Sequence, residues 1–162
     1  MEEKVYETLR NLEIEFEVIE HEPLLTVEDA KKINFQGVEA KNLFLKDKKK
    51  GKYYLVTADA DMRVDMKAVR AITGAGSSLT FGKDEELFEI LHIMRGACSP
   101  FNLINDDNRE VTFVLMKEVF AADDNEKINF HPNVNTKTVV LKMADFMKYV
   151  KSLENTVIIE EK

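Results

Sequence analysis

A short polar segment between two apolar runs is the feature that most constrains how this chain folds. The segment Phe130-His131-Pro132-Asn133-Val134-Asn135-Thr136-Lys137-Thr138 carries a histidine, a proline, two asparagines and two threonines. A polar group that is buried without a hydrogen-bond partner costs about 1–3 kcal/mol, so this segment does not suit a core strand. Pro132 restricts the backbone on both sides of it. The segment therefore predicts a defined turn between two strands, and this turn is either structural or a functional site.

Strand pairs joined by short turns and interrupted by helices predict an α+β fold with a mixed, largely antiparallel sheet. Helical spacing of apolar residues and N-cap residues predict the helices, and alternating or apolar runs predict the strands. Two of the strand pairs form hairpins, one across the lysine-rich turn 46–52 and one across the polar turn 105–109. We expect helices at 2–11, 26–33, 66–72, 85–91 and 144–153, a helical turn at 117–121, and strands at 14–18, 38–46, 53–58, 78–81, 101–104, 111–116, 127–130, 136–141 and 157–159.

The composition indicates a globular protein with a core of its own. The chain has 162 residues, of which 44% are hydrophobic and 33% are charged, as in ordinary soluble domains. No apolar run approaches the roughly 20 residues of a membrane span, and the charged N-terminus is unlike a signal peptide. One cysteine and three scattered histidines show no metal-ligand spacing. We therefore expect a cytoplasmic protein with no metal, no other cofactor and no membrane contact.

The charge distribution limits how this chain could bind a nucleic acid. The formal net charge of -7 argues against non-specific binding to a phosphate backbone. Lysines are nevertheless concentrated in residues 46–52, and Arg63, Lys67 and Arg70 follow them. This basic set is either a solvated hairpin tip or a local contact for an anionic partner.

Lys41 and Asn42 interrupt an otherwise apolar strand-like run. The lysine either points to solvent or projects into a cleft, where its charge can meet an anion or a developing oxyanion. In a regular strand, the side chain of Asn42 lies on the opposite face from that of Lys41. A bulge, or the entry of the strand, would be needed for both to reach one site.

A second candidate is the segment Gly96-Ala97-Cys98-Ser99-Pro100-Phe101. It predicts a tight turn whose backbone N–H groups either face a ligand carbonyl or belong to a plain connection. Cys98 has no activating base near it, since His92 is six residues away on a predicted helix end, so we do not expect a nucleophilic thiol. His92 and His21 are expected to be structural or exposed.

Three segments in this order resemble one family. They are Lys41-Asn42-Leu43-Phe44-Leu45-Lys46-Asp47, then Gly96-x-x-Ser99-Pro100-Phe101-x-Leu103-Ile104-Asn105-Asp106, then Phe130-His131-Pro132-x-x-Asn135-Thr136-x-Thr138. They are similar to the YbaK and prolyl-tRNA-synthetase-associated editing family, and within it to the freestanding alanyl-tRNA(Pro) deacylases of the ProX type. The resemblance extends from about Pro23 to Phe146.

The resemblance implies a single editing domain over residues 1–162, with a mixed, barrel-like sheet surrounded by helices. It implies hydrolysis of the ester that joins alanine to tRNA(Pro), with the acceptor end of the tRNA as partner and prolyl-tRNA synthetase as a candidate second partner. Asn42 supports alanine as the amino acid, because the cysteine-clearing branch typically carries threonine there. Alternatives are a deacylase for cysteine or another small amino acid, or a tRNA-binding module without turnover.

The roles of individual residues also come from this resemblance. Lys41 would hold the 3′-terminal adenosine or its phosphate, Asn42 and the turn after Gly96 would hold the aminoacyl group, and His131 would orient the ester or water. Asn102 departs from the glycine of relatives and would add bulk near the site. The predicted catalytic residues are Lys41, Asn42 and His131; the predicted substrate-binding residues are Gly96, Ala97, Cys98, Ser99, Pro100, Phe101, Asn135 and Thr136; the predicted tRNA contacts are Lys46, Lys48, Lys49, Arg63, Lys67 and Arg70.

Overall fold

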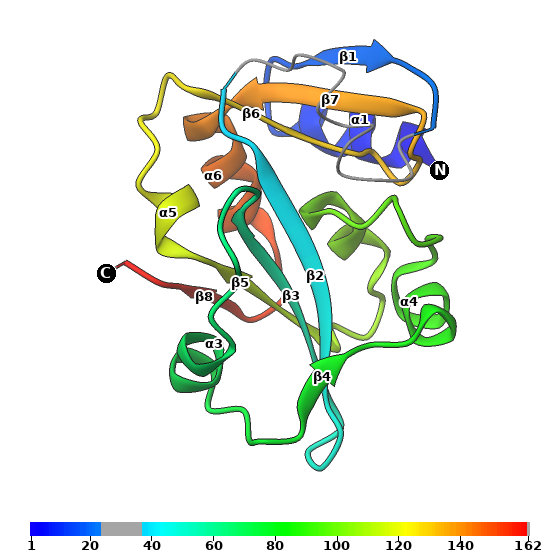
Figure 1. The fold of residues 1–162 in the computed structure, drawn as a ribbon. Helices are drawn as coiled ribbons and strands as arrows, with labels where there is room; N and C mark the ends of the chain where they lie inside the picture. The colour runs from blue at the N-terminus through cyan, green and yellow to red at the C-terminus, as the bar shows by residue number, and fades with distance from the viewer. Residues whose placement is uncertain (24–36, 162) are drawn as a thin grey trace.

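The computed structural model describes residues 1–23 and 37–161, and its fold is α+β, as the sequence predicts (Figure 1). The predicted helix at 26–33 lies outside the described residues. The helices are α1 (Glu2–Asn11), α3 (Met66–Thr73), α4 (Asp84–Leu91), the 3-10 helix η1 (Pro100–Asn105), α5 (Lys117–Phe120) and α6 (Met143–Ser152). The strands are β1 (Glu17–Glu20), β2 (Ala40–Asp47), β3 (Lys52–Asp59), β4 (Leu79–Phe81), β5 (Val111–Leu115), β6 (Lys127–Phe130), β7 (Lys137–Lys142) and β8 (Val157–Ile159).

The described strands form two sheets. The smaller sheet has the order β1-β7-β6 and is antiparallel throughout. The larger sheet has the order β4-β2-β3-β5-β8, in which β2 is antiparallel to β3 and β4, whereas β5 is parallel to both of its neighbours. The expected mixed, largely antiparallel arrangement is confirmed, although these two sheets do not close into a barrel. No helix of the described residues is long and apolar enough to cross a membrane.

The two sheets meet where the chain enters β2. Val38 forms a parallel bridge with Ile128 of β6, and the Val38 N–H donates to the Lys127 carbonyl at 2.7 Å. Gly37 precedes this bridge with a φ of 100°. A Cβ atom at position 37 would lie 1.9 Å from the Lys127 carbonyl oxygen, so only glycine fits this crossing.

The predicted β2–β3 hairpin is confirmed, and a buried carboxylate holds its turn. The Asp47 side chain accepts hydrogen bonds from the Ser78 hydroxyl at 2.7 Å, the Gly76 N–H at 3.0 Å and the Lys50 N–H at 3.3 Å. These hydrogen bonds, that of Ser78 first, lower the pKa of Asp47 to about 2. Asp47 is therefore ionised at neutral pH and connects the lysine-rich tip to the segment before β4.

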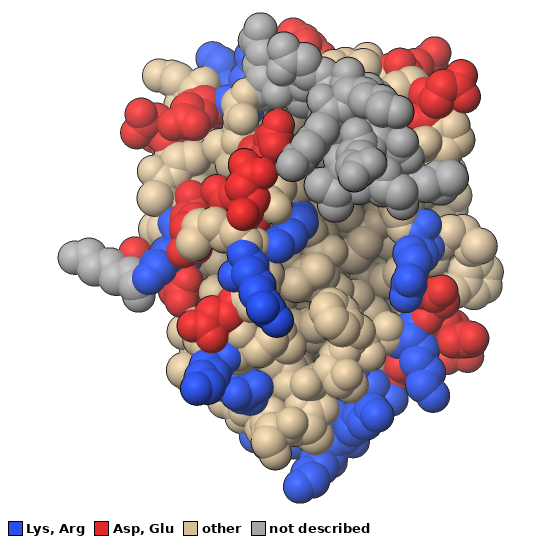
Figure 2. Space-filling view, viewed as in Figure 1, with Lys and Arg blue, Asp and Glu red and all other residues tan. Residues whose placement is uncertain are grey.

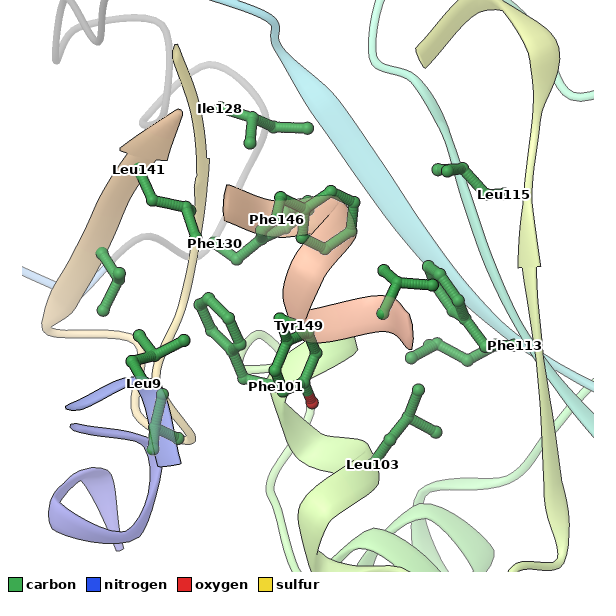
Figure 3. Close-up of a cluster of buried hydrophobic side chains, with 14 of the residues drawn as sticks. Leu9, Phe101, Leu103, Phe113, Leu115, Ile128, Phe130, Leu141, Phe146 and Tyr149 are labelled. Atoms are coloured by element: carbon green, nitrogen blue, oxygen red, sulfur yellow. The ribbon is translucent and has the colours of Figure 1, made fainter. Parts of the chain in front are cut away.

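An aromatic cluster lies where α6, β6 and η1 meet (Figure 3). The ring of Phe101 packs edge-on against Phe130 at 5.8 Å and against Tyr149 at 5.2 Å. Phe146 lies 4.8 Å from the Phe130 ring. These four side chains are almost completely buried, so the segments on either side of His131 and Ser99 rest on one rigid core.

One strand prediction was wrong, and another strand begins later than predicted. Residues 101–104 form the 3-10 helix η1 rather than a strand, because the Ser99 hydroxyl caps the Phe101 N–H and Pro100 opens the helix. The predicted hairpin across 105–109 is therefore absent, and β5 pairs in parallel with β3 and β8 instead. The strand expected at 14–18 starts later, at Glu17, and follows a left-handed residue at Glu13 with a φ of 59°.

Candidate active site

His131 lies in the turn between β6 and β7, as the polar segment predicts. The Ser99 hydroxyl donates to the His131 carbonyl at 2.7 Å. Ser99 is completely buried, so this hydrogen bond is shielded from water. The second and third motif segments, which are far apart in the sequence, are therefore in direct contact.

A buried amide network locks these two segments together. The Asn102 side chain accepts from the Ser99 N–H at 2.6 Å and donates to the Asn133 amide oxygen at 2.8 Å. Asn105 donates to the same oxygen at 3.1 Å and to the Leu91 carbonyl at 2.9 Å. Asn133 itself has a φ of 65°, a conformation that asparagine tolerates better than most residues. Asn102 is fully buried, so its side chain joins the two segments from inside.

Lys41 and Asn42 lie at the start of β2 and point in different directions. Each residue of β2 pairs with one residue of β3 from Ala40 to Asp47, so there is no bulge and the two side chains start on opposite faces. The Lys41 ammonium donates to the Met62 carbonyl. The expected bulge is therefore absent, and the described strand does not bring the two side chains to one face; β4 leaves the outer edge of β2 open before Leu45.

The Asn42 amide has a fixed orientation. Its oxygen accepts from the Thr57 hydroxyl at 2.6 Å, and Thr57 is completely buried. The oxygen side is thus occupied, and the NH₂ group has no acceptor among the described residues. Asn42 can therefore offer a donor to a bound carbonyl oxygen.

The parallel bridge at the sheet crossing relates Lys41 to His131. Lys41 follows Val38 by three positions, and His131 follows Ile128 by three positions. An extended chain spans at most about 3.6 Å per residue, so each Cα lies within about 11 Å of the bridge. Because the bridge is parallel, both residues leave it in the same direction, so the start of the first motif segment lies near the third, while the rest of the first segment continues along β2 to the hairpin turn at Asp47.

The His131 ring is held in one tautomer. Its Nδ1 lies 2.9 Å from the Lys137 carbonyl, which can only accept, so Nδ1 carries the proton. Burial lowers the pKa of His131 below its ordinary value, and the neighbouring His21 lowers it further, although the hydrogen bond to Lys137 acts in the other direction. His131 is therefore neutral at pH 7, with its lone pair on Nε2.

His21 is a residue that the sequence reasoning missed. Its ring centroid lies 5.9 Å from that of His131, and its Nε2 lies 2.7 Å from the Thr138 hydroxyl. It was expected to be structural or exposed, but its half-buried ring lies directly beside a predicted catalytic residue. The signal was the order of the strands, because β1 places His21 against β7.

The turn after Gly96 contributes backbone donors. The N–H of Ala97 donates to Met94, and that of Ser99 donates to Asn102. The N–H groups of Gly96 and Cys98 have no acceptor among the described residues and can meet a ligand. Burial raises the pKa of the Cys98 thiol to about 12, so it stays protonated and is a poor nucleophile.

The remaining predicted substrate-binding residues differ in exposure. Pro100 is buried and Phe101 belongs to the aromatic cluster, so both support the turn from inside. Asn135 is half-buried and Thr136 is exposed in the β6–β7 turn, close in sequence to His131. Among the described residues, a cavity of about 770 Å³ lies beside β1 and β7, and one of about 200 Å³ is lined by Ala58 and Met62, the neighbours of Lys41; neither is lined by the side chains of Lys41, Asn42 or His131.

The predicted tRNA contacts fall into a paired and an exposed group. Lys46 forms an ion pair with Glu86 at 2.6 Å and lies over the Tyr53 ring. Burial acts to raise the pKa of Glu86, but hydrogen bonds from Lys46 and Tyr53 prevail and hold it at about 2. Lysine and arginine side chains border an uncharged surface on the face in Figure 2. The exposed group contains Lys48, Lys49, Arg63 and Lys67, and Arg70 is half-buried.

Comparisons with known proteins agree with the three motifs. The family model for the aminoacyl-tRNA editing domain matches residues 21–149. The Prolyl-tRNA editing protein ProX of Acetoanaerobium sticklandii is 38% identical over 150 residues, which cover 91% of this chain and 89% of that protein. The Prolyl-tRNA synthetase associated domain-containing protein 1 of Mus musculus is 37% identical over 144 residues, covering 87% of this chain and 84% of that protein.

A solved structure shares the fold. It is described as a candidate trans-editing enzyme for prolyl tRNA synthetase, and it superposes with a TM-score of 0.71. The match covers 96% of this chain and 93% of that chain, at 14% sequence identity. At this identity the likeness concerns the path of the chain and not its individual side chains.

Proposed function

This chain belongs to the aminoacyl-tRNA editing domain family and is an aminoacyl-tRNA deacylase, and we propose that its substrate is mischarged Ala-tRNA(Pro). The reaction is hydrolysis of the ester between alanine and the terminal ribose. Water adds to the carbonyl carbon, the bond to the ribose oxygen breaks, and alanine and free tRNA(Pro) leave. The observation that carries this proposal is the hydrogen bond between Ser99 and His131, which joins the second and third motif segments beside the bridge that leads into β2.

The donors of the site suit a developing oxyanion. The Asn42 NH₂ group and the N–H groups of Gly96 and Cys98 have no acceptor among the described residues, and we assign them to the carbonyl oxygen of the ester. Donors fixed before the substrate arrives stabilise the charge that forms on the carbonyl oxygen, because they need no reorganisation. The Thr57 hydroxyl holds the Asn42 amide in that orientation.

Lys41 supplies positive charge near the terminal nucleotide. Its ammonium donates to the Met62 carbonyl, a neutral partner that does not cancel the charge. We assign to Lys41 the 3′-terminal adenosine or its phosphate, which a compact ammonium can meet as a point charge. An aminoacyl ester is already activated, so positioning and charge stabilisation are sufficient for catalysis.

His131 holds the water or the ester rather than supplying much base strength. Its neutral Nε2 accepts a hydrogen bond from water or from the α-ammonium group of alanine, and its lowered pKa makes it a weak base. The ribose hydroxyl next to the ester can share the activation of water. His131 is thus chiefly an acceptor that fixes geometry.

Selection of alanine over proline rests on the size of the pocket. Each extra methylene forced into a tight site costs about 1–3 kcal/mol. Asn42 supports alanine within this family, since the cysteine-clearing branch typically has threonine at this position. The ester bond itself would not distinguish alanine from proline, because both amino acids are joined to the ribose by the same kind of ester.

The exposed basic residues are the proposed contacts to the acceptor stem. Lys48 and Lys49 project from the hairpin tip that Asp47 holds, and Arg63 and Lys67 are exposed. Lys46 would have to leave Glu86 to contact a phosphate, so its contribution is expected to be smaller. Contact through a few exposed cations is local and salt-dependent, as the net charge of -7 requires.

The test is deacylation of Ala-, Cys-, Ser- and Pro-tRNA(Pro) in parallel, with protein below the concentration of substrate. Multiple turnovers on Ala-tRNA(Pro), with little loss of Pro-tRNA(Pro), are expected. Lys41→Ala should reduce this rate by about 100-fold, while Lys52→Ala, at the exposed start of β3, should not. Preference for Cys- or Ser-tRNA(Pro) would overturn alanine as the substrate, and a failure to turn over would favour a tRNA-binding module.

A further inference from the structure

His21 lies beside His131 and is joined to it through Thr138. The His21 N–H donates to the Thr136 carbonyl at 2.9 Å, so the backbone continues the pairing of β1 with β7. The buried Thr138 hydroxyl lies 2.7 Å from Nε2 of His21 and 3.4 Å from Nδ1 of His131. The planes of the two rings are inclined by 54°. This arrangement keeps both rings against one hydroxyl.

The backbone carbonyls around the rings determine where the protons lie. Nδ1 of His21 is 2.8 Å from the Glu22 carbonyl, and Nδ1 of His131 is 2.9 Å from the Lys137 carbonyl. A carbonyl only accepts, so both Nδ1 atoms are protonated. In neutral His21, Nε2 must then accept the hydroxyl proton of Thr138. The hydroxyl oxygen consequently presents a lone pair, and not its proton, to His131.

The alternative tautomer of His131 conflicts with this arrangement. With its proton on Nε2, His131 would direct the lone pair of Nδ1 at the Lys137 carbonyl oxygen, and two acceptors would face each other. The Thr138 hydroxyl could relieve this contact by donating to Nδ1, but only by giving up its hydrogen bond to His21. As long as His21 accepts the hydroxyl proton, Thr138 cannot donate it to Nδ1 of His131, and the alternative tautomer remains unfavourable.

We propose that His21 is a positioning residue that acts through the Thr138 hydroxyl to keep His131 in the tautomer with its lone pair on Nε2. This inference rests on the proposed function in one respect, because it is the Nε2 atom of His131 that meets the water or the substrate. No hydrogen bond to Nε2 of His131 comes from residues 1–23 or 37–161. His21 itself does not need to touch the substrate.

Nitrogen NMR of the histidine rings in the free protein tests this directly. The chain has three histidines, so each ring signal can be assigned by substitution. His21→Phe and Thr138→Val remove the acceptor and the hydroxyl, whereas His21→Gln and Thr138→Ser retain them. His92→Asn, at the exposed and left-handed end of α4, is the matched histidine control.

The wild type should show His131 protonated on Nδ1 and not on Nε2 at pH 7.5. His21→Phe should move part of the population to the other tautomer, because the freed Thr138 hydroxyl can then donate to Nδ1 of His131. Thr138→Val lacks that hydroxyl, so it should keep the wild-type tautomer, as should the double variant His21→Phe/Thr138→Val, the two conservative variants and the control. His21→Phe should also lower kcat by about fivefold, the rate equivalent of one hydrogen bond, with KM unchanged. Recovery of kcat in His21→Gln would separate positioning from a general loss of structure.

Wild-type nitrogen shifts of His131 in His21→Phe would overturn the proposal, and so would an equal tautomer shift in the double variant His21→Phe/Thr138→Val. If His21→Phe does not fold, His21→Leu, which also lacks an acceptor for the Thr138 hydroxyl, takes its place. The shifts are recorded without substrate, so they decide the question even if the wild type deacylates no tRNA. In that case the proposed deacylase function would be wrong, and the spectra would still decide whether His21 positions His131.

Discussion

The two ends of the candidate site are held by different chemistry. At the His131 end, neutral amides and a hydroxyl are buried and satisfy one another, with Asn102 and Asn133 at the centre. At the hairpin end, the ionised Asp47 anchors a turn whose lysines are exposed. Salt screens exposed charges but has little effect on buried neutral hydrogen bonds. We therefore expect the neutral end to hold the geometry of the proposed reaction, and the charged end to supply an attraction for the proposed tRNA substrate that weakens as salt is raised.

The largest effect should come from removing a donor beside the neutral end. Asn42→Ala should lower kcat for Ala-tRNA(Pro) by about 10²–10³-fold, because it removes one donor to the developing oxyanion. Single-turnover deacylation of labelled Ala-tRNA(Pro) measures this loss. Asn108→Ala, at an exposed turn, is the control and should behave as the wild type. A kcat equal to that of the control would remove Asn42 from the chemistry.

The next largest effect concerns the amide network itself. Asn102→Ala should lower the free energy of unfolding by about 3 kcal/mol, because it leaves the Ser99 N–H and the Asn133 oxygen short of partners in a buried place. Urea unfolding at two salt concentrations measures this, and the loss should be the same at both. Asn125→Ala, which is exposed, should change little. A loss that shrinks as salt is raised would contradict the neutral character of this end.

A smaller effect is expected at the hairpin end, on binding alone. Reversing the charge of Lys48 and Lys49 together should raise KM for full-length Ala-tRNA(Pro) by about tenfold at low salt, through lost phosphate contacts. KM for alanyl-adenosine should not change, because that substrate lacks the acceptor stem. Lys148→Glu, an exposed lysine of α6, is the matched charge control. Equal effects on both substrates would rule out a stem contact at the tip.

The smallest effect is the pH dependence between pH 5 and pH 8. The pKa of His131 lies below its ordinary 6.5, so the rate should rise with pH only below about 6.5 and be level above it. Asp47, with a pKa of about 2, stays ionised throughout this range, so the hairpin end adds no titration. A pH series of kcat for the wild type and His131→Asn tests this. A wild-type profile without the rise would leave His131 a positioning role only.

Local patterns predicted most of the elements but not all of their partners. The hairpin of β2 and β3 follows from apolar runs around Gly51, and α3 follows from Asp65 as N-cap and Gly74 as the left-handed end. β5 was expected as a strand, but its parallel neighbours β3 and β8 were not, because such pairing joins segments far apart in the sequence. The 3-10 helix η1 was missed because capping by Ser99 outweighed the apolar character of residues 101–104.

The candidate site was likewise only partly predictable from the sequence. Lys41, Asn42 and His131 could be named from motifs, although their roles are still predictions. The hydroxyl that fixes Asn42 could not, because it depends on the register of the hairpin. The amides that join Ser99 to Asn133 could not either, because they bring η1 against the β6–β7 turn, far away in the sequence. His21 is the clearest case, since it meets Thr138 across 117 positions of the chain.

Gly37, at the crossing of the two sheets, limits which substitutions this part of the chain tolerates. At position 37 there is no room for even a methyl group beside the Lys127 carbonyl. The strand β2, which carries Lys41, and the strand β6, which precedes His131, meet at this crossing. A bulkier residue at position 37 would therefore push the two strands apart. Substitutions in the lysine-rich tip, residues 46–52, do not affect this crossing. Substitutions in the lysine-rich tip can thus change its charge without moving the backbone that supports Lys41 and His131.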